Sequence, residues 1–395
     1  MGIARLAAIG SRIRLKQVLS VSRAVALRQT SFYPPFVERF ERRFAAYIGR
    51  QHGLSFCNGT SAIEATMFAA NINEGDEVIV PSCTFHSSID PIINHRATPV
   101  FVDIDADSLT ICPADVARKI TARTRAIIVV HLFGTPANLD AILASTAGRD
   151  IRVIEDASHS HGATWRGRKC GGIGDYGVFS LQARKAVGAG EGGIVVTDRT
   201  DDYLRMSMWG HFTRHAARFG EIGMEAFQHT GVGYKRRMAP LSALLADADL
   251  DYLDRVNAIV SANVRALDEA LSPMAGVRTL RLPAHAERGG FFHGYPLIIE
   301  KEGRTAADAI AVLKAHGVRA GSYPFARHHT LDVYLDREYR EAVLGGCTAA
   351  RPSKPPAPLP VTDRIATQLV LLPRRYLGSV TSAFVGNVRA ALRAL

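Results

Sequence analysis

The sequence predicts an α/β protein whose large first domain surrounds a mainly parallel sheet and whose smaller second domain is α+β. From about residue 54 to 197, short β-branched runs alternate with helical stretches of roughly ten residues, which is the pattern of βαβ units. After about residue 260 the alternation stops, and a Pro-rich stretch at 349–359 reads as an exposed connection. The predicted division is a basic N-terminal helical extension at 1–30, a large domain at 31–250 and a small domain at 251–395.

Composition narrows the class of protein. The 395 residues suffice for two domains and a substantial core, and 47% hydrophobic with 22% charged residues is typical of a soluble globular chain. No apolar run approaches the roughly 20 residues that a membrane-spanning helix needs. The five cysteines are scattered without a C-x-x-C pair, so they indicate neither a disulfide framework nor a zinc site and favour the reducing cytoplasm.

Basic residues are concentrated at the N-terminus. The net charge is +11, and residues 1–37 contain six basic side chains and no acid. No folded stretch has a basic stripe interleaved with aromatic residues, so we expect no nucleic-acid partner, while the positive balance suits anionic small substrates. Four apolar residues near helical spacing make the first 30 residues a candidate amphipathic helix: Ile3, Leu6, Ile9 and Ile13. Three roles compete for it: packing on the body or a partner subunit, which we favour, membrane-surface attachment, and a transit peptide.

The first predicted elements surround a turn that can bind an anion. Pro34 and Pro35 start a helix at 36–48, and a short apolar strand follows at 54–57. The turn at 58–61 then leads into a helix at 62–70. A strand, a Gly-Thr-Ser turn and a helix start together offer free N–H groups, hydroxyls and the positive end of the helix dipole. An ordinary helix cap explains the same residues equally well.

The next predicted elements complete the parallel sheet. Its strands fall at 77–81, 99–103, 126–131, 151–156 and 194–197, and its helices at 87–95, 113–120 and 138–145. Sites in such sheets gather at the carboxyl ends of the strands. Phe85, Asp156 and the 58–61 turn all follow strand ends, so we expect them to converge.

The stretch from 154 to 197 suggests the chemistry of the site. Asp156 ends an apolar run, and Lys185 is followed by small residues from Gly188 to Gly193. Pyridoxal 5'-phosphate (PLP) needs a lysine to form a Schiff base and an acid against its pyridine nitrogen. Each residue alone has a plainer explanation, as a helix cap, a surface lysine or a tight turn, and only their order and spacing favour the cofactor.

The rest of the chain is predicted in less detail. Residues 205–232 read as a long loop with at most one helix, and loops of this length are often functional. A helix follows Pro240. The small domain is predicted to contain strands at 277–282 and 291–299 and helices at 306–316 and 380–395.

Assembled, these residues resemble the DegT/DnrJ/EryC1/StrS family of PLP-dependent aminotransferases over roughly residues 35–390. The motifs in question are NGTSA (58–62), GDEVIVPSCTF (75–85), PVFVDID (99–105), VHLFGTP (130–136), IEDASHSHGA (154–163), GDYGVFS (174–180) and Lys185 with AGEGGIVVT (189–197). The resemblance implies the fold-type-I PLP architecture, the cofactor pyridoxal 5'-phosphate and a homodimer with shared active sites. No metal is expected, because the adjacent His328 and His329 lack further ligands at metal-like intervals.

The resemblance also implies roles at matching positions. Lys185 would form the Schiff base and shuttle the proton between Cα and C4′ of the cofactor. Asp156 would hold the pyridine nitrogen protonated, and His159 would contact the phenolic oxygen. Phe85 would stack on the pyridine ring. The phosphate would be bound by Gly59, Thr60, Ser61 and Ser180, with Lys235 of GYKRRM (233–238) standing where many relatives have an asparagine for the neighbouring subunit's phosphate.

The implied reaction is a ping-pong transamination from glutamate or glutamine to a keto-sugar, usually nucleotide-linked, or to a ketocyclitol. A dehydratase branch of the family has histidine at the lysine position, and Lys185 argues against it. A non-catalytic regulatory homologue is a further alternative, which the intact set of site residues disfavours. The usual glycine-rich entry arm is not legible before residue 36. We expect the 205–232 loop and residues 320–335 to shape the acceptor site; Arg327, His328 and His329 are candidate residues there without assigned roles.

Overall fold

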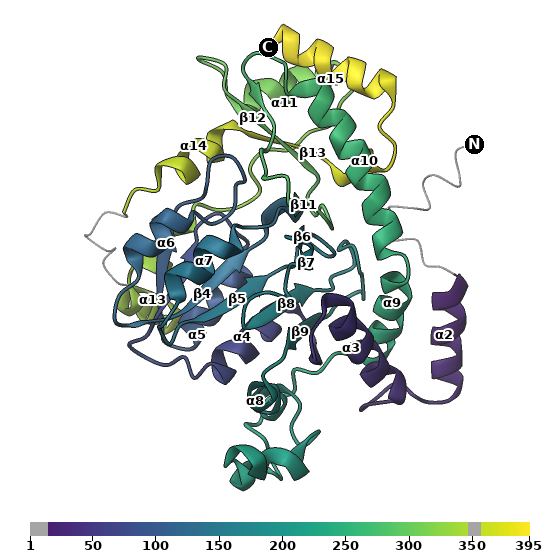
Figure 1. Ribbon diagram of the computed structural model, residues 1–395, viewed down its shortest axis with the longest axis vertical. Helices are drawn as coiled ribbons and strands as arrows, with labels where there is room; N and C mark the ends of the chain where they lie inside the picture. The colour runs from purple at the N-terminus through teal and green to yellow at the C-terminus, as the bar shows by residue number, and fades with distance from the viewer. Residues whose placement is uncertain (1–14, 347–356) are drawn as a thin grey trace.

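The structure is a computed structural model that describes residues 15–346 and 357–395. Its centre is a seven-stranded sheet of strand order β1-β9-β8-β5-β4-β2-β3 (Figure 1). The strands are β1 (His52–Phe56), β2 (Glu77–Pro81), β3 (Thr98–Val102), β4 (Thr124–Val130), β5 (Arg152–Asp156), β8 (Tyr176–Ser180) and β9 (Gly193–Thr197). The pairs between β3 and β8 are parallel, whereas β9 pairs antiparallel with both β8 and β1. The predicted mainly parallel sheet is therefore confirmed.

Helices cover the sheet, which explains why its strands are apolar along their length. Both β2 and β9 are buried at every residue. The helices of this part are α3 (Pro35–Ile48), α4 (Gly59–Ala69), α5 (Asp90–Asn94), α6 (Pro113–Lys119), α7 (Leu139–Thr146), α8 (Thr200–Gly210) and α9 (Pro240–Leu250), with short turns η1 (His86–Ser88) and η2 (Leu132–Gly134). α4 packs on β8 and β9. Its first residue, Gly59, lies against Ser180 at the end of β8.

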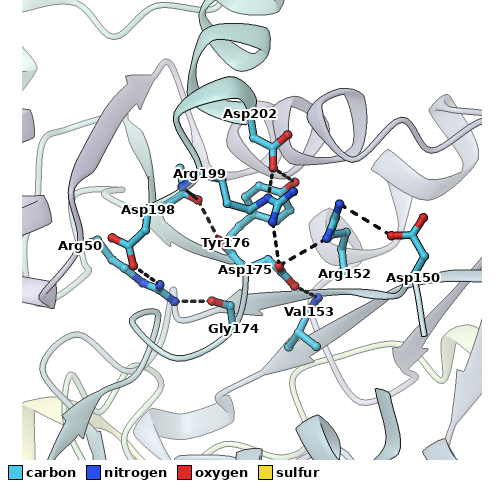
Figure 2. A network of polar contacts seen from close by, with 11 residues as sticks. Arg50, Asp150, Arg152, Val153, Gly174, Asp175, Tyr176, Asp198, Arg199 and Asp202 are labelled. Atoms are coloured by element: carbon cyan, nitrogen blue, oxygen red, sulfur yellow. Dashed lines mark hydrogen bonds and ion pairs between the residues drawn. The ribbon is translucent and has the colours of Figure 1, made fainter. Parts of the chain in front are cut away.

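A polar network joins the other end of the sheet, where β5 and β8 begin and β9 has just ended (Figure 2). Asp175 accepts a hydrogen bond of 2.8 Å from the Val153 N–H, which ties the start of β8 to β5. Arg50 pairs with Asp198 at 2.6 Å and also donates to the Gly174 carbonyl. These contacts fix the strand ends that lie away from the candidate site.

A second, antiparallel sheet of three strands has the order β10-β12-β13. It consists of β10 (Val277–Arg278), β12 (Tyr295–Ile299) and β13 (Leu369–Leu372), and it packs with α10 (Leu253–Leu271), α11 (Ala306–Ala315) and α15 (Ser382–Ala394) around an apolar core of its own. Long helix α10 runs from α9 towards this core (Figure 1). A small ribbon of β6 (Thr164–Trp165), β7 (Arg168–Lys169) and β11 (Ala286–Glu287) connects the two parts. The remaining elements are α12 (Asp332–Leu335), α13 (Arg337–Leu344), α14 (Pro360–Gln368), η5 (His328–Thr330) and η6 (Arg374–Gly378). The domain boundary at 250/251 stays a prediction.

Residues 211–235, here called the excursion, leave the body after α8 and protrude at the bottom of Figure 1. They contain η3 (Ala216–Ile222) and η4 (Glu225–Phe227). Arg214 anchors the excursion through a bidentate pair with Glu41 of α3, with N–O distances of 2.9 and 2.6 Å. Glu41 also accepts hydrogen bonds from the N–H and hydroxyl of Ser55 on edge strand β1. Residues 205–210 complete α8, which is consistent with the one helix that the prediction for 205–232 allowed.

Helix α2 (Leu15–Ala26) packs against α9, as in the favoured alternative for the N-terminal extension. Gln17 is buried there, and its amide donates to the Leu245 carbonyl at 3.0 Å and to Asp249 Oδ1 at 3.2 Å. The four apolar residues that suggested the helix lie outside the described residues. Within the described ranges, no helix is both long enough and apolar enough to cross a membrane.

Two predicted strands of the small domain are wrong in their bounds. The strand expected at 291–299 begins only at Tyr295, because Phe291 and His293 have positive φ of 48° and 69° and Gly294 one of 115°. Such angles do not fit an extended strand. The strand expected at 277–282 is paired only at Val277 and Arg278.

Candidate active site

A cavity of about 350 Å³ opens where β5 and β8 end and α4 begins. Seven of the nine residues predicted for the site line it: Gly59, Thr60, Phe85, Asp156, His159, Ser180 and Lys185. The convergence at the carboxyl ends of the strands follows from the parallel sheet, since these ends meet at one edge.

Asp156 is the last residue of β5, and its carboxylate is buried and oriented by two donors. The Ser88 hydroxyl donates to Oδ2 at 2.7 Å, and the Ser158 N–H donates to Oδ1 at 3.1 Å. Both bonds fix the orientation of the carboxylate in the cavity. The cavity therefore contains a fixed carboxylate that can hold a proton on a basic nitrogen.

Glu155 precedes this acid and faces the opposite side of the sheet, because side chains alternate along a strand. Its carboxylate contacts His131 at 2.9 Å and accepts N–H bonds of 2.6 to 2.7 Å from Gly171, Ile173 and Gly174. Burial alone would raise its pKa, but these partners lower the pKa of Glu155. The pair is a structural anchor beneath the cavity.

Lys185 lies in a tight turn between β8 and β9. The turn is closed by hydrogen bonds from the Lys185 N–H to the Gln182 carbonyl and from the Ala183 N–H to the Gly190 carbonyl, both of 2.8 Å. Burial of the amine lowers the pKa of Lys185 to about 7, with the positive charges of Arg374 and Arg184 adding to the decrease and Asp156 opposing it. An amine of this pKa is a substantial fraction free base at neutral pH, and the free base is the nucleophilic form.

His159 is buried beside the cavity, and its Nδ1 has no hydrogen-bond partner among the described residues. Its ring packs on Phe292, His293 and Phe325 at centroid distances of 4.7, 5.1 and 6.5 Å. Burial, with nearby Lys185, lowers the pKa of His159 well below its ordinary value, so the ring is neutral. A buried, unpaired ring nitrogen in a cavity is suited to a polar atom of a ligand.

The start of α4 provides an anion cradle. Asn58 caps the helix by accepting the Ser61 N–H at 2.8 Å, which leaves the N–H groups of Gly59 and Thr60 without intrahelical acceptors. A Cβ on Gly193 would lie only 2.3 Å from the Asn58 carbonyl oxygen, so glycine is needed for this close approach. The structure does not place Ser61 in the cavity: its hydroxyl turns to Cys57 Sγ at 3.4 Å. The contact of Ser61 with the phosphate stays a prediction.

Other predicted residues lie elsewhere. Lys235 does not line this cavity; it is on the excursion, with its amine 5.3 Å from the Phe212 ring centroid. Nor do the candidates near 320–335 line it: His328 and His329 bond to the carbonyl and hydroxyl of Ser82, at 3.0 and 2.8 Å. They support the chain that leads to Phe85, and a contribution of residues 320–335 to the acceptor site stays a prediction.

The sequence analysis missed several lining residues, among them Ser88, Gln182, Phe292 and His293. Ser88 and Gln182 stand three residues from the predicted Phe85 and Lys185, so proximity in sequence was an available signal. Phe292 and His293 were hidden in a run that reads as a strand. Their approach to the cavity depends on the backbone angles of that run.

The residues present fit PLP. The cradle offers N–H donors for a phosphate, Asp156 a carboxylate for the ring nitrogen, His159 an unpaired nitrogen, and Lys185 an amine poised as free base. Among the described residues, no group of three or more His, Cys, Asp or Glu side chains is arranged to hold a metal ion.

Comparison with known proteins gives the same assignment. The profile of the DegT/DnrJ/EryC1/StrS aminotransferase family matches residues 16–377. The chain is 31% identical to GDP-perosamine synthase of Vibrio cholerae over 76% of its own length and 79% of the relative's. It is 34% identical to L-glutamine:2-deoxy-scyllo-inosose aminotransferase of Micromonospora echinospora, over 74% and 73% of the two chains.

Solved structures agree in fold. The crystal structure of 3-amino-5-hydroxybenzoic acid synthase superposes with a TM-score of 0.81 at 27% identity, covering 97% of both chains. DesI with its TDP-sugar product gives a TM-score of 0.79 at 29% identity, over 98% of this chain and 93% of the other. The chain belongs to the DegT/DnrJ/EryC1/StrS aminotransferase family and is a PLP-dependent aminotransferase.

Proposed function

We propose that this aminotransferase moves an amino group from glutamate or glutamine to a nucleotide-linked keto-sugar or to a ketocyclitol. The observation that supports it most is the meeting of Lys185 and Asp156 in one cavity. The two aligned relatives act, by their names, on a sugar nucleotide and on a cyclitol, which is why both acceptor classes are retained. Arg184 lines the same cavity, and no ion pair to an acid is found for it in the described ranges, so it is available to an anionic substrate.

In this proposal the chain's own residues bind and orient the cofactor, which supplies an electron sink for the carbon that gains or loses the amino group. Gly59, Thr60 and Ser180 bind its phosphate, and Phe85 covers its ring. Asp156 keeps its ring nitrogen protonated. His159, held neutral by burial, uses its unpaired nitrogen to orient the phenolic oxygen.

Lys185 has two tasks in the proposed reaction. Its amine holds the cofactor between turnovers, and once released it moves a proton between two carbon positions. A pKa of about 7 suits both tasks, because the amine then accepts and returns a proton at little cost near neutral pH.

We further propose a homodimer with shared sites in the cytoplasm. The excursion places Lys235 away from its own cavity and exposes Tyr234 and Val232, which favours contact with a neighbouring subunit. Mixing Lys185→Ala and Lys235→Ala homodimers tests this. If Lys235 acts on the partner's phosphate, hybrids regain activity in one of their two sites; if each chain serves itself, mixing restores nothing.

The experiment that tests the chemistry is borohydride reduction of the yellow holoenzyme followed by peptide mapping. The label is expected on Lys185. In a separate sample that is not reduced, glutamate or glutamine should bleach the cofactor band. A label elsewhere would refute the assignment. Bleaching by neither donor would favour the dehydratase alternative. If a donor does bleach the band, the aminated enzyme serves to screen keto-sugar nucleotides against ketocyclitols.

A further inference from the structure

A strained segment at residues 290–294, here called the arch, reaches from the small domain to the catalytic lysine. Gly290, Phe291, His293 and Gly294 all have positive φ, of 67°, 48°, 69° and 115°. For a phenylalanine and a histidine such angles are uncommon. Strain of this kind persists only where the surroundings enforce it, and it concentrates at functional sites.

The surroundings of the arch do enforce it. At one end, a Cβ on Gly290 would lie 2.6 Å from the His159 carbonyl oxygen, and the Gly290 N–H donates to Asn257 Oδ1 at 3.0 Å. At the other end, a Cβ on Gly294 would lie 2.1 Å from the Leu372 carbonyl oxygen. The arch is therefore clamped between the loop that follows β5 and strand β13. This leaves the residue between its two strained positions with little freedom.

That residue is Phe292, and its ring faces the lysine. The amine nitrogen of Lys185 lies 3.4 Å from the centroid of the Phe292 ring. An aromatic face attracts an ammonium ion through its quadrupole but does not attract a neutral amine in this way. The contact thus discriminates between the two protonation states of the lysine.

We propose that Phe292 is a positioning residue for the transamination, whose ring face receives the Lys185 amine when the lysine is free and stabilises it after it takes up a proton. This rests on the proposed role of Lys185. The nitrogen gains the proton that leaves one carbon and returns it to the other, so no co-reactant is needed. The ring favours only the charged form of the lysine, which exists after the proton has left the first carbon and before it reaches the second. Its stabilising effect is therefore largest at this stage, so it lowers the barrier of the transfer more than the energy of the resting enzyme.

Other charged or titratable groups also face the amine. Asp156 opposes the lowering of its pKa, whereas Arg374 and Arg184 add to it. The two nearby histidines are neutral at pH 7, because burial lowers the pKa of His293 to about 4 and that of His159 well below its ordinary value. The Phe292 ring and Asp156 therefore both favour the charged form of Lys185, whereas Arg374 and Arg184 disfavour it.

The test measures the protonation of Lys185 directly. In the aminated holoenzyme the lysine is free, and its rate of modification by a small amine reagent, followed by peptide mapping across pH, gives its pKa. Three variants are compared with wild type: Phe292→Leu, which removes the π face, Phe292→Tyr, which keeps it, and Phe325→Leu. Phe325 is a matched control because its ring packs on His159 and His293, as the Phe292 ring does, while the Lys185 amine lies over the ring of Phe292.

Cation–π energies correspond to a decrease of the Lys185 pKa by about half a unit to one and a half units in Phe292→Leu. The tyrosine variant and the Phe325 control should keep the wild-type value, and kcat should fall more than KM changes in the leucine variant alone. An unchanged pKa would overturn the proposal, and so would an increase, which is what simple admission of water to the amine produces. Borohydride fixation on Lys185 in every variant checks the proposed function separately.

Discussion

Removing Glu41 should reveal how firmly the excursion is held. Its carboxylate is 2% exposed at the side chain, and Arg214 is 7% exposed, so the pair is buried. Deleting one partner of a buried ion pair leaves an uncompensated charge and costs about 3–5 kcal/mol. Glu41→Ala also deprives the Ser55 N–H of its acceptor, which adds roughly 1–3 kcal/mol if that group stays dry. We expect a loss of unfolding free energy of at least about 3 kcal/mol.

The assay is urea unfolding of the holoenzyme variants, followed by circular dichroism. Glu38→Ala is the matched control on the same helix, because Glu38 and Arg42 form a pair whose side chains are 59% and 68% exposed. Exposed pairs at this spacing contribute only about 0.3–0.5 kcal/mol. The control should therefore unfold almost as wild type does.

A double variant, Glu41→Leu with Arg214→Met, separates charge from packing. Replacing both charges by apolar groups is often neutral, so the double variant should be more stable than Glu41→Ala. If Glu41→Ala loses less than about 1 kcal/mol, or the double variant is no better than the single one, the buried charge is not what holds the excursion. Loss of cofactor affinity in Glu41→Ala would further connect the anchor to Lys235.

The acceptor half-reaction should slow as pH falls below about 7, because burial lowers the pKa of Lys185 to about 7 and protonation then removes its free base. Stopped-flow rates of the aminated enzyme between pH 5 and 9 give the midpoint of this decrease. A midpoint near 10 would contradict the prediction. Gln17→Ala should weaken cofactor binding several-fold with little loss of global stability. The reason is that the Gln17 amide orients Asp249, which accepts a hydrogen bond from the Gly188 N–H in the lysine turn. Equal cofactor dissociation constants for variant and wild type would exclude this link. Ser88→Ala removes a 2.7 Å hydrogen bond to Asp156 and should lower kcat by roughly tenfold, the equivalent of about 1.4 kcal/mol. Unchanged turnover would show that the Ser158 N–H alone suffices to orient the Asp156 carboxylate.

The sequence predicted the large sheet and most of its site because both are local in the chain. Asp156 and Phe85 follow strands whose apolar runs are legible, and the lysine turn is marked by glycines. For Ser61, the motif alone does not say which side of the helix start its hydroxyl faces. Here the Asn58 cap and Cys57 decide that.

What the sequence did not predict depends on contacts between distant segments. The apolar run around Phe292 reads as a strand, but its ends have positive φ and lie against the carbonyls of His159 and Leu372, where only glycine fits. Likewise, the buried pair of Glu41 and Arg214 joins residues 173 positions apart. Neither residue belongs to a recognisable motif, and the two side chains become buried only when the excursion packs against α3.

The two adjacent acids at the end of β5 make this strand intolerant of misalignment. A slip of one residue exchanges the faces of a strand, so Glu155 would enter the cavity and Asp156 would turn inward. The shorter side chain could no longer span the distance to His131 and the Gly171 and Gly174 N–H groups, which would be left buried without a partner. The hydrogen bonds of Glu155 therefore select the correct register of β5 without any contribution from the cofactor. A variant that swaps the order of the two acids should fail to fold even though its composition is unchanged.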